Sequence, residues 1–258
     1  SIVNLSADRR VSIAKGGRSR LIDDALNLLE VPGRLKPPTR VLIKPNLVRV
    51  PCSSPYAKVR GAYEPTITPE GDINHRETLE ALLNYLTGIG LRDITIGEAS
   101  GGAETPIIYK ALALYDLAEE YNAKLVDLNY AESVSVPVKG MVMDHVWIPR
   151  LVLDAEFTIN LAVLKTHGGT VVTLCLKNWG IGIPPGHYYG SNKAGSRWAG
   201  VEGTLPIHNK VPPVQVMGQE VAVSRVLVDV CLTRVPDLNI IDGYTAVDYE
   251  ELGARNYR

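Results

Sequence analysis

The sequence has too few cysteines, too widely spaced, for a disulfide-bonded or cluster-binding protein. Its three cysteines, Cys52, Cys175 and Cys231, are far apart and form no CxxC pair. A disulfide framework or a cysteine-only metal site needs paired or closely spaced cysteines, so neither is encoded. The chain's own cysteines therefore encode no iron–sulfur cluster.

Long apolar runs and an excess of one charge are also missing. The apolar segments have the length of β-strands, well below the roughly 20 residues of a membrane helix. The first residues lack the basic and then apolar order of a signal peptide. The 27 basic residues nearly balance the 28 acidic ones, for a net charge of −1. We therefore expect a cytoplasmic protein that binds neither nucleic acid nor membrane.

Several common catalytic signatures are absent as well. The sequence contains no GxxxxGK[ST], no GxGxxG between a strand and a helix, no HExxH and no GxSxG. The chain has one phenylalanine, 17 prolines and only two glutamines, Gln215 and Gln219, with its charges dispersed. That composition is typical of proteins from thermophiles.

The pattern that is present is an alternation of strand-like and helix-like segments, which indicates a parallel sheet covered on both faces. With 258 residues, 45% of them hydrophobic, the chain is long enough to bury a large core. We predict an α/β fold: a mainly parallel open sheet with helices on both faces, in a single domain over residues 1–258. Long loops are expected at 49–73 and 180–213, and a small antiparallel subdomain around 134–138.

The individual elements follow from hydrophobic periodicity. Strands are predicted at 10–14, 40–43, 93–96, 124–128, 157–164 and 238–241, and helices at 19–29, 75–86, 106–122 and 170–179. Segment 221–235 fits either type, because its β-branched residues favour a strand and its length favours a helix.

The most informative segment follows the apolar run 157–164. There the chain changes abruptly to Lys165, Thr166 and His167, and then to the pair Gly168 and Gly169. Lys177 and Asn178 follow about three helical turns later. Cations, an imidazole and flexible backbone at the C-terminal end of a buried strand are typical of the place where open α/β folds bind ligands.

Other predicted strands end in a similar way. Lys44 and Asn46 follow the strand at 40–43, Glu98 follows the strand at 93–96, and Asp242 follows the strand at 238–241. Because the C-terminal ends of parallel strands lie at one edge of a sheet, we expect these side chains to converge.

The residue types at these strand ends suit the binding of a small anion. Ammonium groups bind carboxylate or phosphate oxygens, and crowding lowers the pKa of one of them toward that of a base; the candidates are Lys44, Lys165 and Lys177. Amide side chains orient a ligand, here Asn46 and Asn178, and glycine backbone lets N–H groups approach it, here Gly168 and Gly169.

Three further residues are candidates for proton transfer or metal binding. His167 could act as general acid and base. Glu98 and Asp242 could act as a base or bind a divalent metal, which is one candidate cofactor. Each has a structural alternative: Glu98 could cap the following helix and Asp242 could form a turn with Gly243. A lysine after a strand could equally be solvated.

Four segments resemble a known family. They are Val-Leu-Ile-Lys-Pro-Asn-Leu-Val at 41–48, Leu-Lys-Thr-His at 164–167, Leu-Lys-Asn-x-Gly at 176–180 and Ile-Ile-Asp-Gly at 240–243. In this order they resemble the family called domain of unknown function 362. Many members carry a ferredoxin-like module for 4Fe–4S centres, so the resemblance implies a redox partner protein. This chain lacks that module. It ends soon after residue 243, and we expect it to be either a short form of the family or a chain truncated at its C-terminus.

From the sequence we expect an enzyme that acts on a small anionic substrate, a carboxylate or a phosphate, linked to a metal or redox cofactor. One alternative is a non-catalytic binding or accessory protein for a metal, a cluster or an anionic metabolite. Another is a structural or assembly protein whose site has decayed. The sequence leaves open whether the chain is an enzyme, and also its substrate, reaction class, metal and oligomeric state.

Overall fold

The computed structural model describes residues 10–50, 70–167, 170–193, 196–198, 215–216, 219–220, 223–250 and 253–257. The helices are α1 (Arg18–Leu28), α2 (Val31–Arg34), the short 3₁₀ helix η2 (Glu70–Asp72), α3 (Arg76–Gly88), α4 (Thr105–Ala111), α5 (Leu114–Glu120), α6 (Arg150–Asp154), α7 (Leu174–Gly182), α8 (Gly186–Tyr189) and α9 (Val223–Cys231). The strands are β1 (Val41–Lys44), β2 (Ile94–Glu98), β3 (Lys124–Asp127), β4 (Ser133–Pro137), β5 (His145–Pro149), β6 (Phe157–His167), β7 (Val171–Val172), β8 (Ser191–Lys193), β9 (Ser196–Trp198), β10 (Gln215–Val216), β11 (Gln219–Glu220), β12 (Leu238–Glu250) and β13 (Gly253–Tyr257).

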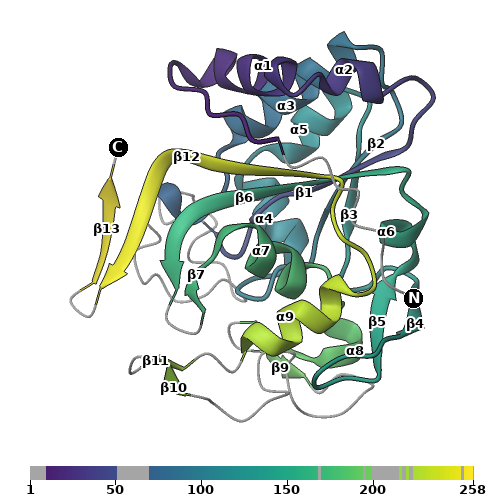
Figure 1. The fold of residues 1–258 in the computed structure, drawn as a ribbon, viewed down its shortest axis with the longest axis vertical. Coiled ribbons are helices and arrows are strands. Elements are labelled where there is room, and N and C mark those ends of the chain that lie inside the picture. Colours follow the sequence, from purple (N-terminus) through teal and green to yellow (C-terminus); the bar gives the residue numbers. More distant parts are fainter. Residues whose placement is uncertain are drawn as a thin grey trace.

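The main sheet has the order β13-β12-β6-β1-β2-β3, with β7 paired to β6 (Figure 1). Strands β12, β6, β1, β2 and β3 run parallel to one another, whereas β13 and β7 are antiparallel to their neighbours. This mainly parallel open sheet confirms the predicted fold class. The predicted antiparallel unit is also present, because β4 and β5 form a two-stranded antiparallel sheet of their own.

Helices cover both faces of the sheet (Figure 1). Side chains of β1 alternate between the two faces, as those of a strand must. Val41 and Ile43 belong to a core with residues of α1, α3, α4 and α5. Leu42 points the other way, into a second core that contains Trp179 of α7 and Val226 of α9. The next residue on that second face is Lys44, at the end of the strand.

The helix predicted at 75–86 is α3. Its predicted apolar stripe, Leu79, Leu82, Leu83 and Leu86, is completely buried. The predicted helix at 19–29 is likewise α1, one residue shifted. Strong helical periodicity thus predicted the elements that cover one face of the sheet.

Two sequence predictions about elements are wrong. The strand expected at 10–14 does not form: Val11 and Ile13 are 84% and 88% exposed, and Ser12 donates a hydrogen bond to the carbonyl of Ala25 on α1. So short a β-branched segment does not form a strand unless a neighbouring strand of a sheet pairs with it. The helix expected at 106–122 is divided into α4 and α5 at Ala113, whose φ of 50° is left-handed.

The region after β6 also differs from the prediction. The helix expected at 170–179 begins only at Leu174. The residues before it form β7, which turns back and pairs with the end of β6. The ambiguous segment 221–235 contains the helix α9. Most of the predicted loop at 49–73 and much of that at 180–213 lie outside the described residues.

Candidate functional site

The C-terminal ends of β1, β2 and β6 lie side by side in the sheet, as the sequence predicted. A cavity of about 440 Å³ opens at this edge. Of the predicted site residues that the structure describes, all but Asp242 line it: Lys44, Asn46, Glu98, Lys165, His167, Lys177 and Asn178. Residues 120 or more positions apart in the sequence therefore converge on one site.

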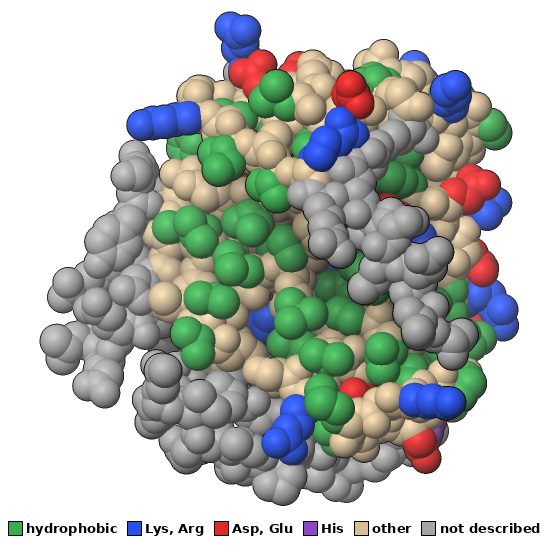
Figure 2. Space-filling model, in the orientation of Figure 1, with side chains coloured by type: hydrophobic (Ala, Val, Ile, Leu, Met, Phe, Trp, Pro, Cys, Tyr) green, Lys and Arg blue, Asp and Glu red, His purple; other side chains and the backbone are tan. Residues whose placement is uncertain are grey.

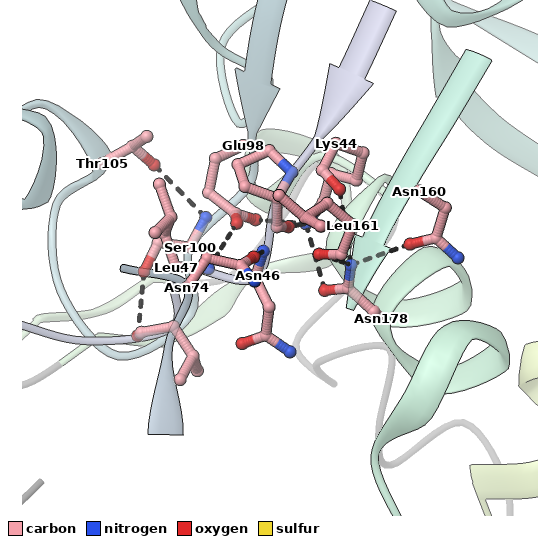
Figure 3. Close-up of polar contacts among 12 residues, drawn as sticks. Lys44, Asn46, Leu47, Asn74, Glu98, Ser100, Thr105, Asn160, Leu161 and Asn178 are labelled. Carbon is pink, nitrogen blue, oxygen red and sulfur yellow. Dashed lines mark hydrogen bonds and ion pairs between the residues drawn. The ribbon is translucent and has the colours of Figure 1, made fainter. Parts of the chain in front are cut away.

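A buried ion pair joins the first two strand ends. The ammonium of Lys44 lies 2.7 Å from Oε1 of Glu98, and the two side chains are only 1% and 3% exposed. Oε2 of Glu98 accepts a hydrogen bond of 2.8 Å from the backbone N–H of Leu47 (Figure 3). Burial lowers the pKa of Lys44 and raises the pKa of Glu98, while the charge of each partner opposes these shifts.

Amide side chains tie α7 to this pair (Figure 3). Nδ2 of Asn178 donates hydrogen bonds to Oδ1 of Asn160, at 2.8 Å, and to the carbonyl of Leu161, at 3.2 Å. Oδ1 of Asn178 accepts a long hydrogen bond of 3.4 Å from Nζ of Lys44. The helix that follows β6 is thereby fixed above the end of β1.

Glycine at position 182 lets α7 approach Lys44 closely. A Cβ at this position would lie 2.5 Å from both Cε and Nζ of Lys44. That separation is well inside van der Waals contact, so a larger residue at 182 would have to displace the ammonium group from Glu98.

A second buried ion pair forms between β6 and η2. Nζ of Lys165 lies 2.8 Å from Oδ1 of Asp72 and also donates to the backbone carbonyl of Asp72 at 2.6 Å. Oδ2 of the same carboxylate lies 3.3 Å from Nε of Arg49. Burial lowers the pKa of Lys165, and the Asp72 carboxylate opposes this shift. Asp72 is thus shared by two cations.

Lys177 differs from the other lysines of the cavity. Its side chain is half-buried, and within the described part of the chain it makes no hydrogen bond or ion pair. Burial is the main cause that lowers the pKa of Lys177 to about 7, and the positive charge of Lys165 acts in the same direction. Asp72 opposes the shift, but its carboxylate is already bound to Lys165 and Arg49.

The described residues that line the cavity carry more positive than negative charge. Two carboxylates, Asp72 and Glu98, face four cationic side chains, Lys44, Arg49, Lys165 and Lys177. With every one of these groups ionised, the cavity has an excess of two positive charges. An anion can supply the missing negative charge.

Asn46 lines the same cavity and has one buried polar atom without a partner among the described residues. Asn46 is only 5% exposed, and its side-chain Oδ1 has no hydrogen-bond partner among the described residues. Its backbone N–H is bound instead to Oδ1 of Asn74, at 2.6 Å. Because buried polar groups are almost always hydrogen-bonded, this acceptor oxygen is suited to a hydrogen-bond donor on a ligand.

His167 lines the cavity as the last residue of β6. The glycine pair that follows it, Gly168 and Gly169, lies outside the described residues. The predicted backbone contacts of these glycines therefore stay predictions.

Asp242 lies on β12 and is not among the residues that line the cavity. Its Oδ2 accepts a hydrogen bond of 2.7 Å from Oγ1 of Thr78 on α3, and its Oδ1 accepts one of 3.1 Å from the N–H of Tyr244. Within the described ranges, no group of three or more His, Cys, Asp or Glu residues is arranged to hold a metal. The metal role of Asp242 stays a prediction.

The sequence reasoning missed Asp72, Arg49 and Asn129, which also line the cavity. Asp72 and Arg49 fall in the segment 49–73, which has no periodicity that would place it. Asn129 could have been found, since it lies just beyond the end of β3. Its Oδ1 accepts a hydrogen bond of 2.9 Å from the N–H of Gly186, and its Nδ2 donates to the carbonyl of Ser100 at 3.2 Å.

Comparison with known families identifies the chain. The family described as "Domain of unknown function (DUF362)" matches residues 41–255, which is most of the chain. The chain belongs to this family, as the sequence resemblance indicated. No curated protein matches the chain.

Proposed function

We propose that this member of the family is an enzyme that binds a small carboxylate or phosphate anion in the cavity at the strand ends and acts on it there. The observation that carries the proposal is Lys177, a cationic side chain with no counter-charge among the described residues, in a cavity where Glu98 and Asp72 are already paired. A buried or half-buried charge without a partner is costly, and a bound anion removes that cost.

The size of the cavity limits the substrate. Small-molecule sites typically have volumes of about 300–1,000 Å³, and the volume of about 440 Å³ lies in the lower part of this range. A metabolite with few carbon atoms and one or two anionic groups suits this space better than a nucleotide does.

The side chains have distinct roles in this proposal. Lys177 and Arg49 contact the anion directly. Lys44 and Lys165 contribute positive potential from within their ion pairs, and the amide of Asn46 fixes the orientation of the ligand. His167 transfers a proton. A divalent cation would have to displace a paired cationic side chain in order to reach Glu98 or Asp72.

Calorimetric titration with phosphate, sulfate and oxalate tests anion binding. We expect at least one of these anions to bind to the wild type, and Lys177→Gln to weaken its affinity by about tenfold or more, since a charge-assisted contact contributes about 1.5–3 kcal/mol. Removing Lys177 breaks no ion pair among the described residues, so the variant should fold normally. Lys124→Gln is the control, because Lys124 is exposed and pairs with Asp93 away from the cavity.

Equal affinity in the wild type and in Lys177→Gln would overturn the site assignment, as would the lack of binding by all three anions. Catalysis is tested separately by NMR of a mixture of small carboxylates and phosphates incubated with the protein. We expect the wild type to change the mixture and His167→Gln to leave it unchanged. An anion that binds and is never converted would show a binding protein instead of an enzyme.

A further inference from the structure

We propose that Lys177 is a nucleophile that forms an imine with the carbonyl carbon of a small oxo-carboxylate. The inference rests on the proposed anion site and specifies the substrate class and the residue that reacts with it. It assigns to Lys177 a covalent role beyond the binding of charge.

The geometry separates Lys177 from the other cations of the cavity. Lys44 is held by Glu98 at 2.7 Å, and Lys165 is held by Asp72 at 2.8 Å. Arg49 lies 3.3 Å from the second oxygen of Asp72. Lys177 lines the same cavity, and among the described residues no group binds its nitrogen. An amine that is not committed to an ion pair can turn toward a substrate and attack it.

The surroundings of Lys177 favour the neutral, nucleophilic form of its amine. Burial and the positive charges of Lys165, Lys44 and Arg49 disfavour protonation, and Asp72 opposes them. A lysine activated by desolvation and neighbouring cations is a known way to obtain a reactive amine at neutral pH. With a pKa of about 7, a large share of the Lys177 amine is neutral at pH 7, whereas almost none of an ordinary lysine is.

The same arrangement matches the two halves of an oxo-carboxylate. The paired cations supply an excess of positive potential for the carboxylate, while the amine meets the adjacent carbonyl. Asn46 and His167 both line the cavity, so their side chains are placed to contact the hydroxyl that forms during the reaction. A phosphate or a simple carboxylate offers no carbon that a neutral amine attacks readily.

The reaction needs no oxidant or reductant. The lone pair of the Lys177 nitrogen forms a bond to the carbonyl carbon while the π pair of the C=O bond moves to oxygen, and one proton passes from that nitrogen to the oxygen to give a carbinolamine. His167 then donates a proton to the hydroxyl, the C–O bond breaks to release water, and the nitrogen lone pair forms the C=N bond of a protonated imine. Addition of water reverses these steps and regenerates the amine and the carbonyl.

Reductive trapping tests the imine. Glyoxylate and sodium cyanoborohydride are added to the wild type and to Lys177→Arg at pH 7, and modified peptides are quantified by mass spectrometry. Hydride reduces the imine to a stable secondary amine, so each labelled lysine gains one carboxymethyl group. We expect Lys177 to be labelled at least about tenfold faster than the exposed Lys124, which is paired with Asp93, because burial and the neighbouring cations favour the neutral amine of Lys177. Oxalate, which occupies the anion site without forming an imine, should slow this labelling.

The outcomes separate the two proposals. Labelling of Lys177 no faster than that of Lys124, in a protein to which oxalate binds in calorimetry, would overturn the imine and leave the anion site standing. Lack of oxalate binding together with slow labelling would overturn both. Fast labelling at other lysines, unchanged in Lys177→Arg, would place the reactive amine elsewhere and also reject the proposal.

Discussion

At the scale of single residues, the cavity contains two kinds of lysine. Lys44 and Lys165 are buried in ion pairs, so their removal leaves a carboxylate without its partner. Lys177 has no partner among the described residues, so its removal leaves no such defect. Substitutions of the two kinds therefore have opposite consequences for stability.

Breaking the Lys44 pair should destabilise the protein. We expect Lys44→Met to lower the free energy of unfolding by about 3–5 kcal/mol, because Glu98 stays buried without a counter-charge. Urea unfolding measures the effect. The double variant Lys44→Met with Glu98→Leu should recover most of the loss, since both charges are then gone. A single variant as stable as the wild type would contradict the buried pair.

Removal of Lys177 should change the pH dependence of stability. The pKa of Lys177 is about 7 in the folded protein, below the ordinary value of 10.5. Between these values the unfolded chain binds more protons, so the contribution of Lys177 to the free energy of unfolding falls as the pH is lowered from about 10 to 7. We expect Lys177→Met to gain stability relative to the wild type across this range, with no further gain below pH 7.

Urea unfolding of both proteins at a series of pH values measures this difference. Comparison with the wild type removes the contributions of the other titrating groups. A difference that does not vary with pH would show that Lys177 is protonated as readily in the folded protein as in the unfolded chain.

At the scale of elements, hydrophobic patterns predicted the strands whose ends form the site. The buried runs in β1, β2 and β6 end where polar residues begin, so Lys44, Glu98 and Lys165 could be placed at one edge of the sheet from sequence alone. Asp72 could not be placed, because its partner Lys165 is 93 positions away and no local pattern links the two. Such pairing depends on the path of a loop, which periodicity does not describe.

Local propensity failed where tertiary contacts decide the structure. The β-branched segment 10–14 found no strand to pair with, and the residues before α7 pair with β6 instead of continuing the helix. The helix α7 that follows carries Lys177 and Asn178, and both residues line the cavity.

Packing of α7 against α9 depends on a glycine. A Cβ at Gly180 would lie 2.8 Å from Cδ2 and 2.9 Å from Cα of Leu227 on α9. We expect Gly180→Ala to lower the free energy of unfolding by about 1–3 kcal/mol, because the two helices must move apart. Thermal unfolding measures the change, and anion affinity should fall with it since α7 carries Lys177.

Gly88→Ala is the matched control. Gly88 ends α3, and a Cβ there meets no atom within 4 Å. We expect this variant to be as stable as the wild type or more stable by up to about 1 kcal/mol, because alanine restricts the unfolded chain. Equal effects of the two substitutions would contradict the close contact between α7 and α9.

At the scale of the whole molecule, the positive cavity contrasts with a balanced total charge. The net charge is −1, and charged side chains of both signs are scattered over the face shown in Figure 2. The same face carries many hydrophobic side chains near its centre. No helix in the described part of the chain is long and apolar enough to span a bilayer. The proposed attraction for an anion would therefore act locally in the cavity, and we expect salt to weaken anion binding only moderately.

The most direct test of the central claim, an anion site at the strand ends, is anomalous diffraction from crystals soaked in selenate, with data collected at the selenium edge. We predict a selenium peak inside the cavity, near Lys177 and Asn46, that is lost in crystals of Lys177→Met under the same conditions. Selenium peaks confined to the outer surface, or a cavity peak of equal height in both proteins, would contradict the account.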